Sequence, residues 1–236
     1  MKSYKKVAFV IPAYNEGAVI NGVINSLNAE LKKEPFSYKI IVVDDGSKDD
    51  TAKIASSAGA HVIKHILNTG SGGATATGLS YAQQNSFDIA ITLDADGQHD
   101  PKDAIRGLRE INKRKCDLLI GSRLMDSSGM SNVKILGNKG LSFITYILFG
   151  INVTDSQSGL RLYSKKALDT LKWKTSGYEF CSEMLWRAKQ LKLDIQEYPI
   201  KAIYTKYSSA KGQNNWNAIN IIKSLLKRRI VEIFGE

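Results

Sequence analysis

The fold is decided by one stretch, Asp88-Ile-Ala-Ile-Thr-Leu-Asp94-Ala-Asp96-Gly-Gln98, in which an apolar run leads directly into two carboxylates. A continuous apolar run is typical of a strand buried on both faces of a parallel sheet. Alternate residues of a strand share a face, so Asp94 and Asp96 can turn toward one point past its end. Two hard oxygen ligands suit Mg²⁺ or Mn²⁺, which takes further ligands from phosphates. The stretch predicts a metal-held diphosphate and a nucleotide-linked substrate; the alternative is a polar turn.

Strand-like and helix-like segments alternate through the first half of the chain. The predicted strands are residues 7–11, 38–43, 60–64, 88–93 and 117–120. The predicted helices are residues 18–31, a helix capped by Asp49 or Asp50 that ends near Ser57, and residues 73–84 and 102–113. Repeated strand–helix units predict an α/β fold with a mostly parallel sheet and helices on both faces.

Polar motifs follow three of these strands at the point where each strand ends. They are Pro12-Ala-Tyr14-Asn-Glu16, Asp44-Asp45 and Asp94-Ala-Asp96. In such folds, ligands bind outside the carboxyl ends of the strands. The coincidence favours a binding site over a set of unrelated turns.

The second half of the chain is less regular. It predicts a short strand at 159–163, a helix at 182–191, one or two strands within 193–204, and an amphipathic helix at 216–234. We find no internal repeat, low-complexity tract or Pro-rich linker. The sequence therefore predicts one domain over residues 1–236, with a first half at about 5–125 and a second half at about 126–236.

Composition narrows the range of partners. The net charge of +10 predicts partners that carry phosphate, although no nucleic-acid-binding signature is present. Cys116 and Cys181 lack metal-ligand spacing, and the N-terminus does not resemble a secretory signal, so we expect a reduced cytoplasmic protein. The longest uncharged run, 140–154, is shorter than the roughly 18 to 20 apolar residues of a membrane-spanning helix.

Together with Gly121-Ser-Arg123 and Asp155-x-x-Ser-Gly-x-Arg161, the three strand-end motifs occur in an order that resembles the family-2 inverting glycosyltransferases of the GT-A fold. The branch that they resemble is that of the dolichyl- or polyprenyl-phosphate mannose synthases. The resemblance covers about residues 5–205. It implies a single Rossmann-like nucleotide-sugar domain.

The resemblance also implies roles on the donor side. The loop with Pro12, Tyr14 and Glu16 would cradle the base and ribose, and the pair Asp44 and Asp45 would hold the nucleoside, with Asp44 as the direct contact. Asp94, Asp96 and Gln98 would bind Mg²⁺ or Mn²⁺. Arg123 would supply a cation near the diphosphate, so Asp94, Asp96 and Arg123 also count as donor-binding residues.

The acceptor side departs from the family pattern. Where the branch commonly has an arginine, this chain has Gly137-Asn-Lys139-Gly140, and a lysine is a point charge that cannot replace the guanidinium fork. Lys211 is the candidate cation of the closing loop. Asp155 and Arg161 are either loop-end surface residues or acceptor-side and loop-ordering residues. Glu183 either begins an amphipathic helix or serves the acceptor.

We therefore expect a metal-dependent inverting glycosyltransferase that acts on a lipid-linked acceptor, most simply a polyprenyl phosphate, with Asp96, Arg123 and Asp155 as catalytic residues. Asp155 would be the base if the acceptor were instead a hydroxyl of a growing glycan. Less favoured alternatives are a nucleotidyltransferase and a non-catalytic nucleotide-sugar-binding module.

Two segments predict contact with a membrane surface. They are the uncharged run 140–154 and the predicted C-terminal helix with Lys223, Lys227, Arg228 and Arg229. A basic, partly apolar face suits an anionic membrane or a membrane-protein partner, and the alternative is that both segments pack the core. The expected location is cytoplasmic and peripheral at the membrane.

Two further features have competing interpretations. The loop Asn68-Thr-Gly70-Ser-Gly72-Gly73 suits a tight turn and helix packing, and a backbone phosphate site is the alternative. His99 suits a hydrogen bond that braces the carboxylate loop, because imidazole is a poor ligand for Mg²⁺.

Overall fold

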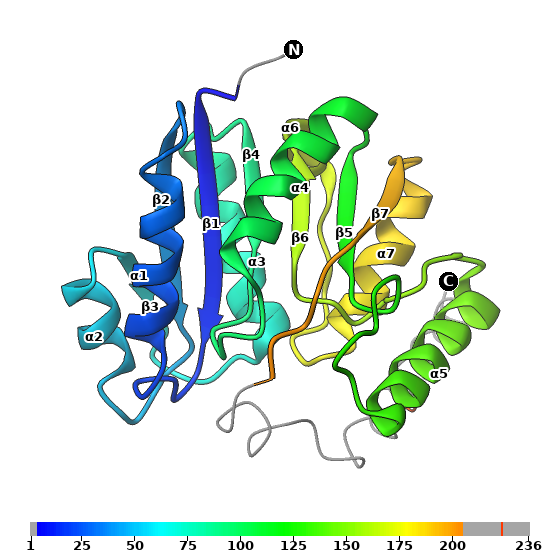
Figure 1. Ribbon diagram of the computed structural model, residues 1–236, viewed down its shortest axis with the longest axis horizontal. Coiled ribbons are helices and arrows are strands. Elements are labelled where there is room, and N and C mark those ends of the chain that lie inside the picture. Colours follow the sequence, from blue (N-terminus) through cyan, green and yellow to red (C-terminus); the bar gives the residue numbers. More distant parts are fainter. Residues whose placement is uncertain (1–3, 205–222, 224–236) are drawn as a thin grey trace.

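The computed structural model describes residues 4–204 and Lys223, and it shows an α/β domain built on one seven-stranded sheet (Figure 1). The strands are β1 (Lys6–Ala13), β2 (Ser37–Asp44), β3 (His61–Lys64), β4 (Ile89–Thr92), β5 (Leu118–Ser122), β6 (Arg161–Ser164) and β7 (Ile195–Pro199). The helices are α1 (Ile20–Leu31), α2 (Thr51–Ser57), α3 (Ser71–Gln84), α4 (Pro101–Arg114), α5 (Asn132–Phe149), α6 (Lys165–Thr170) and α7 (Phe180–Gln190).

The sheet is mostly parallel, as the sequence predicts. Its strand order is β3-β2-β1-β4-β6-β5-β7, and only β6 runs antiparallel to its neighbours β4 and β5. Ala13 at the end of β1 pairs with Asp44 at the end of β2. The motifs that follow β1 and β2 therefore emerge side by side, at the edge of the sheet where β4 also ends.

The central strand β1 shows why a continuous apolar run forms a strand here. Every residue from Val7 to Ile11 is fully buried. Val7, Phe9 and Ile11 face one core with α1, α2 and α4, while Ala8 and Val10 face a second core with α3, α5, α6 and α7. A strand covered on both faces needs apolar side chains at every position.

Local signals set the ends of the helix that follows the carboxylate loop. Asp100 accepts a hydrogen bond from the backbone N–H of Lys102, and Pro101 occupies the first turn. Lys115 ends α4 in the left-handed conformation. A side-chain cap and a proline at the helix start are the signals that a sequence can show directly, and the helix predicted at 102–113 is confirmed.

The structure adds two helices that the sequence did not predict, α5 and α6. The uncharged run 140–154 forms the second half of α5 and the loop after it. Of the one or two strands expected in 193–204, β7 is present. The helix predicted at 216–234 lies outside the described residues except for Lys223, which is exposed. In the part of the chain that the structure describes, no helix is long and apolar enough to cross a bilayer.

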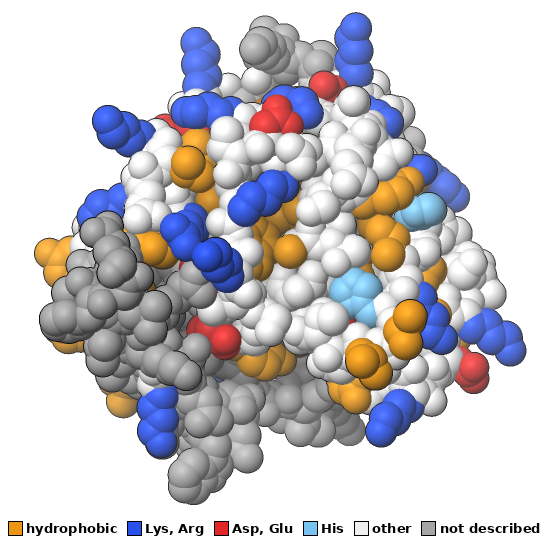
Figure 2. Space-filling view, turned by 180° about the vertical axis from the view of Figure 1, so that it is seen from behind, with side chains coloured by type: hydrophobic (Ala, Val, Ile, Leu, Met, Phe, Trp, Pro, Cys, Tyr) orange, Lys and Arg blue, Asp and Glu red, His pale blue; other side chains and the backbone are white. Residues whose placement is uncertain are grey.

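The basic character of the chain is visible on its surface. On the face opposite to that of Figure 1, Lys and Arg side chains stand out around the rim and acidic side chains are few (Figure 2). The chain carries 33 Lys and Arg against 23 Asp and Glu. The surface therefore attracts anions over a broad area.

Candidate active site

A cleft of about 610 Å³ opens at the carboxyl edge of the sheet. Its walls come from both halves of the chain. Among the residues predicted from the sequence, the cleft is lined by Pro12, Tyr14, Glu16, Asp45, Asp94, Asp96, Gln98, Arg123 and Arg161. Residues that the sequence did not single out, among them Lys134, Asn138, Gln157 and Tyr178, line the other side. A cleft of this size accommodates a nucleotide sugar.

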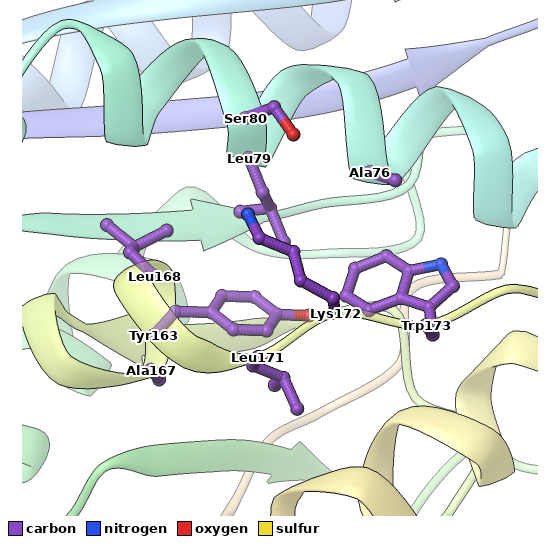
Figure 3. A pocket seen from close by; sticks show the side chains of 9 residues that line it. All are labelled: Ala76, Leu79, Ser80, Tyr163, Ala167, Leu168, Leu171, Lys172 and Trp173. Atoms are coloured by element: carbon purple, nitrogen blue, oxygen red, sulfur yellow. The ribbon is translucent and has the colours of Figure 1, made fainter.

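A second cavity has a different character. It measures about 40 Å³ and lies between α3 and the segment around α6. Figure 3 shows the side chains around this cavity: the aromatic rings of Tyr163 and Trp173, and the leucines Leu79, Leu168 and Leu171. This space is enough for one water and not for a substrate. The carboxyl-edge cleft is therefore the candidate active site.

The carboxylate loop is braced from below. His99 is buried, and its Nε2 lies 2.9 Å from Asp94 Oδ2. The backbone N–H of Gln98 donates to Asp96 Oδ1 at 3.0 Å, across a Gly97 with a φ of 76°. A Cβ atom at Gly159 would collide with the Asp94 carboxylate, so a larger residue there would displace this carboxylate. The geometry agrees with the bracing role expected of His99.

The two carboxylates differ in pKa. Burial, together with the negative charge of Asp94, raises the pKa of Asp96 to about 6. Burial also acts to raise the pKa of Asp94, but the hydrogen bond and charge of His99, with the charges of Arg123 and Arg161, hold this pKa below its ordinary value. The pair therefore repels itself when both groups are ionised. A cation bound between the two carboxylates would remove this repulsion.

The acidic pair after β2 divides into two different environments. Asp45 uses both oxygens: Oδ1 lies 2.7 Å from His65 Nδ1 and accepts from Thr69, and Oδ2 accepts from the N–H of Gly70 at 2.7 Å. Asp44 is buried, and its Oδ1 accepts from the N–H of Ser47 at 3.1 Å. Asp44 Oδ2 is buried and has no hydrogen-bond partner within residues 4–204.

The two aspartates therefore differ in their hydrogen bonding: Asp45 anchors the loop that follows β3, whereas one oxygen of Asp44 is not engaged by the described part of the chain. The hydrogen bonds from Thr69, His65 and Gly70 hold the pKa of Asp45 below its ordinary value against the opposing effect of burial. An orphaned buried oxygen costs free energy unless a ligand satisfies it. Asp44 therefore retains an oxygen with no bonded partner among the described residues, although Asp45 is the residue of the pair that lines the cleft.

The loop after β1 is held by the loop after β2. The N–H of Asn15 donates to Ser47 Oγ at 2.9 Å, and the N–H of Glu16 donates to Thr51 Oγ1 at 2.8 Å. Asn15 adopts a left-handed φ of 53°, which turns the chain sharply. Glu16 is buried, whereas Tyr14 is 38% exposed at the cleft. The loop thus presents an aromatic ring and a carboxylate to the same space.

The glycine-rich loop before α3 is already engaged through its backbone. The N–H of Gly70 donates a hydrogen bond to Asp45, and the N–H of Gly72 donates to the carbonyl of Ser176 at 2.7 Å. A Cβ atom at Gly70 would collide with the Ser176 carbonyl. These contacts fit the turn and packing role rather than a phosphate cradle.

Arg123 and Asp155 form a buried ion pair. Arg123 Nε lies 2.7 Å from Asp155 Oδ2, and Nη2 lies 2.9 Å from Oδ1. Asp155 is fully buried and does not line the cleft. Burial acts to raise the pKa of Asp155, but the charge and hydrogen bonds of Arg123 hold it below its usual value.

Both oxygens of Asp155 accept hydrogen bonds from Arg123, a geometry that does not favour the expected role of Asp155 as a catalytic base. The ion pair instead orients the guanidinium of a residue that lines the cleft. The backbone of Asp155 is held by Glu197 of β7, whose Oε1 accepts from the N–H of Asp155 at 3.0 Å. No sequence motif pointed to Glu197, because this contact joins residues 42 positions apart.

The contacts of Arg161 fit the loop-ordering alternative better than that of a surface residue. It is 1% exposed, and its guanidinium donates to the carbonyls of Ser158 at 2.8 Å and Ser156 at 2.7 Å. It also lines the cleft, and its charge acts on both Asp94 and Asp155. Arg161 therefore holds the 155–158 loop in place and adds positive potential to the site.

Glu183, which was expected on the acceptor side, bonds to the backbone of the segment before α7 and is not among the residues that line the cleft. It is fully buried. Its carboxylate accepts from the N–H of Lys174 at 3.0 Å and from the N–H of Thr175 at 2.8 Å. The neighbouring Ser176 accepts a hydrogen bond from the N–H of Gly72. Glu183 therefore stabilises the glycine-rich loop indirectly, through the segment that contains Ser176.

The structure describes one of the two lysines that were predicted for the acceptor side. Lys139 is exposed on α5 and does not line the cleft, whereas Lys134, one and a half turns earlier, does line it. Lys134 Nζ lies 3.9 Å from the centre of the Tyr204 ring. Lys211 lies outside the described residues. Lys134 was missed because the family pattern drew attention to position 139.

Comparison with known proteins is consistent with the sequence motifs. The chain matches the family model described as "Glycosyl transferase family 2" over residues 8–172. It is 42% identical over 252 aligned positions to a UDP-N-acetylglucosamine–dolichyl-phosphate N-acetylglucosaminyltransferase of Methanococcus voltae, covering 97% of this chain and 98% of that protein. It is 30% identical to an undecaprenyl-phosphate mannosyltransferase of Micrococcus luteus, covering 87% of each.

Solved structures show the same fold. Glucosyl-3-phosphoglycerate synthase of Mycobacterium tuberculosis, crystallised with Mn²⁺, UDP and glucosyl-3-phosphoglycerate, superposes with a TM-score of 0.72 at 20% identity. The match covers 98% of this chain and 80% of that one. Mannosyl-3-phosphoglycerate synthase of Rubrobacter xylanophilus gives a TM-score of 0.69 at 18% identity, covering 98% of this chain and 74% of that one.

Proposed function

The chain belongs to glycosyl transferase family 2, and we propose that it moves one sugar, with inversion, from a nucleoside diphosphate sugar to a polyprenyl phosphate. The reaction would depend on Mg²⁺ or Mn²⁺. One observation carries this proposal: Asp94, Asp96 and Arg123 line a single cleft at the carboxyl edge of the sheet. Two carboxylates and a guanidinium in one space suit a substrate that brings both a metal ion and a diphosphate.

The residues present fit a divalent ion. Asp94, Asp96 and the amide oxygen of Gln98 are hard oxygen donors, which Mg²⁺ and Mn²⁺ prefer. Burial and the negative charge of Asp94 raise the pKa of Asp96, and a bound cation would offset both effects. Within the described ranges, no three His, Cys, Asp or Glu side chains gather to hold a metal by themselves. The donor diphosphate would then supply the remaining ligands, and the metal would neutralise charge on the leaving group.

The chain's own residues would bind and orient the donor. Asp44 would accept a hydrogen bond from the nucleoside, and the loop with Pro12, Tyr14 and Glu16 would enclose the base and ribose. Arg123 would bind the diphosphate and stabilise the negative charge that develops as it leaves. Asp155 and Glu197 would hold Arg123 in place for this task. These roles assign the first half of the chain, residues 5–125, to the donor. The second half, residues 126–236, is assigned to the acceptor.

A polyprenyl phosphate is the acceptor that suits the cleft best. The Methanococcus voltae and Micrococcus luteus relatives are named for dolichyl phosphate and undecaprenyl phosphate. A phosphate oxygen is already anionic, so it can attack the anomeric carbon without a base. The new carbon–oxygen bond forms as the bond to the donor's β-phosphate breaks, and its electron pair leaves with the nucleoside diphosphate. The engagement of Asp155 with Arg123 fits a reaction without a base.

A hydroxyl acceptor on a growing glycan is the second candidate. It would need a carboxylate to take its proton. Asp155 was the sequence candidate for that role, and its ion pair with Arg123 argues against it. A lipid phosphate also implies work at a membrane surface, and we propose a peripheral location on the cytoplasmic side.

The test is a product assay on the full-length protein. Nucleoside diphosphate sugars are incubated one at a time with a short-chain polyprenyl phosphate and Mn²⁺, and products are identified by mass. We expect a glycosyl polyprenyl phosphate and an equal amount of nucleoside diphosphate, with neither formed in chelator. Transfer to soluble sugars but to no polyprenyl phosphate would favour the hydroxyl acceptor, and release of pyrophosphate would indicate nucleotidyl transfer.

A further inference from the structure

Helix α5 has its apolar side chains on the outside. Only four of its residues are buried, Leu141, Ser142, Thr145 and Phe149, and two of these carry hydroxyl groups. Outside, Leu136 is 74% exposed, Phe143 62% and Ile147 63%. A surface helix of a globular protein normally turns its large apolar side chains toward the core and its polar side chains toward solvent.

The exposed side chains form one continuous strip. At about 100° per residue, Leu136, Phe143 and Ile147 fall within about 40° of one another around the helix axis. Tyr146, 51% exposed, lies beside this strip. The name "outer strip" is used below for Leu136, Phe143 and Ile147. Large apolar patches left in water mark interaction sites.

The opposite side of the same helix forms a wall of the cleft. Lys134, Asn138 and Leu141 line the cleft, and they point roughly opposite to the outer strip. Hydrogen bonds fix this orientation: Ser142 Oγ lies 3.2 Å from Ser156 Oγ, and Thr145 Oγ1 lies 2.9 Å from Ser182 Oγ. In Figure 1, α5 stands apart from the helices that flank the sheet, toward the end at which β1 terminates. Whatever covers the outer strip therefore sits one helix diameter, about 10–12 Å, from the cleft.

Charge selects what covers the strip. α5 contains two lysines, Lys134 and Lys139, and no acidic residue. Lys139 is exposed and borders the outer strip, where its stem can lie along apolar surface with the ammonium outside. A second copy of the chain would bring a further charge of +10. An anionic lipid surface offers the complementary charge and an apolar layer below it.

We propose that α5 is the membrane-contacting element: the outer strip inserts at the boundary between headgroups and acyl chains of an anionic bilayer, with Lys139 at the phosphates. This inference rests on the proposed function, since it places the cleft wall where a polyprenyl phosphate headgroup emerges from the bilayer. Amphipathic helices that lie in this plane bury their apolar face by about 5–10 Å. The lipid chain of the acceptor then stays in the bilayer while its phosphate enters the cleft beside Lys134.

The test is flotation of the full-length protein with vesicles of phosphatidylglycerol and phosphatidylcholine. We expect salt-sensitive binding that falls at least about tenfold in the triple variant Leu136→Gln, Phe143→Gln, Ile147→Gln, as apolar area is lost. The matched control is Leu191→Gln, which changes a leucine that is 43% exposed, lies directly after α7 and is not part of the outer strip. This control should bind like the wild type.

Other occupants of the strip give other outcomes. A wild-type dimer that the triple variant converts to a monomer, seen by analytical ultracentrifugation, would overturn the proposal in favour of a second copy. A triple variant with a markedly lower melting temperature would show that the chain itself covers the strip, and would also overturn it. Unchanged vesicle binding by the triple variant, or an equal loss in Leu191→Gln, would do the same.

Activity separates this inference from the proposed function. With a water-soluble short-chain polyprenyl phosphate, the triple variant should turn over like the wild type, and with long-chain acceptor in vesicles it should be at least about tenfold slower. Absence of transfer by the wild type to either acceptor would refute the proposed function, while the vesicle-binding result would still decide the role of the strip.

Discussion

The cleft has two walls that are built in opposite ways. The wall at the ends of β1, β2 and β4 places polar side chains on short loops anchored in a sheet that is buried on both faces. The wall formed by α5 is a peripheral helix tied down by hydroxyl hydrogen bonds, with its large apolar side chains outside. The first wall suits rigid positioning of a charged donor, and the second suits contact with a partner that completes it.

The largest difference between the walls should be in turnover. Asp96→Asn keeps the shape of the side chain but removes the charge proposed to bind the metal, so we expect turnover to fall at least about a hundredfold. The fold should persist, since the loop lies outside the core. Initial rates at saturating Mn²⁺ and melting temperatures check both points. Asp169→Asn is the matched control, because Asp169 is exposed on α6. Near-normal turnover by Asp96→Asn would remove the main distinction between the walls.

The Arg123–Asp155 pair tests whether rigidity extends behind the donor wall. Removing one partner of a buried ion pair costs about 3 to 5 kcal/mol, so Asp155→Asn should lose that much unfolding free energy and a large part of its turnover. Arg123 binds the donor in this account, so the pH–rate profile should keep its wild-type shape. A profile that loses one ionisation in the variant would instead identify Asp155 as a base.

The same pair has a defined pH dependence. The pKa of Asp155 is lower in the folded protein than in the unfolded chain. Its contribution to stability is therefore fully present above the unfolded value of about 3.9 and is lost as the pH falls toward the folded value. Urea unfolding should show a constant difference between wild type and Asp155→Asn from about pH 8 to 5, shrinking below about pH 4. A difference that shrank already near pH 6 would contradict the assignment.

A smaller effect should separate the two aspartates after β2. Loss of one hydrogen bond to a charged group is worth about 1.5 to 3 kcal/mol, so Asp44→Asn should raise the donor KM about tenfold or more at nearly unchanged kcat. Asp45→Asn should chiefly lower the melting temperature, because Asp45 anchors Thr69 and Gly70. If the two variants behaved alike, the division between free acceptor and loop anchor would be wrong.

The smallest effect should come from the helical wall. Lys134→Gln should raise the KM for a soluble polyprenyl phosphate a few-fold, about the value of one exposed charge pair. Lys139→Gln, on the bordering surface, should leave that KM unchanged and weaken vesicle binding instead. Steady-state kinetics with both acceptor forms compare them directly. An equal loss for both lysines with the soluble acceptor would place Lys139 in the cleft after all.

How much the sequence predicts follows the same division. The donor wall depends on contiguous motifs at strand ends, so its sheet and its cleft-lining residues Tyr14 and Asp94 could be placed from local pattern, whereas Arg123 was placed by the family resemblance. The hydrogen-bond partners of Glu183, Asp155 and Glu197 could not be predicted, because they are set by tertiary contacts. A carboxylate in the sequence does not reveal whether it will face a substrate or an arginine.

Helix α5 escaped prediction for a related reason. Hydrophobic periodicity identifies an apolar face, and it assumes that this face is buried. Here Gly137 and Gly140 interrupt the pattern, and the residues that face inward include Ser142 and Thr145. The sequence predicts that the uncharged run 140–154 contacts a membrane surface, or else packs in the core. It does not show which side chains of the run face inward and which face outward.

One measurement tests the central claim most directly: that the cleft transfers a sugar, and not a phosphate, to a lipid phosphate. The full-length protein is incubated with Mn²⁺, a nucleoside diphosphate sugar and polyprenyl phosphate whose phosphate oxygens carry ¹⁸O, and products are weighed by mass spectrometry. The account predicts a glycosyl polyprenyl phosphate with one phosphorus and all of the label, beside unlabelled nucleoside diphosphate. A lipid product with two phosphorus atoms, released with nucleoside monophosphate, would contradict it.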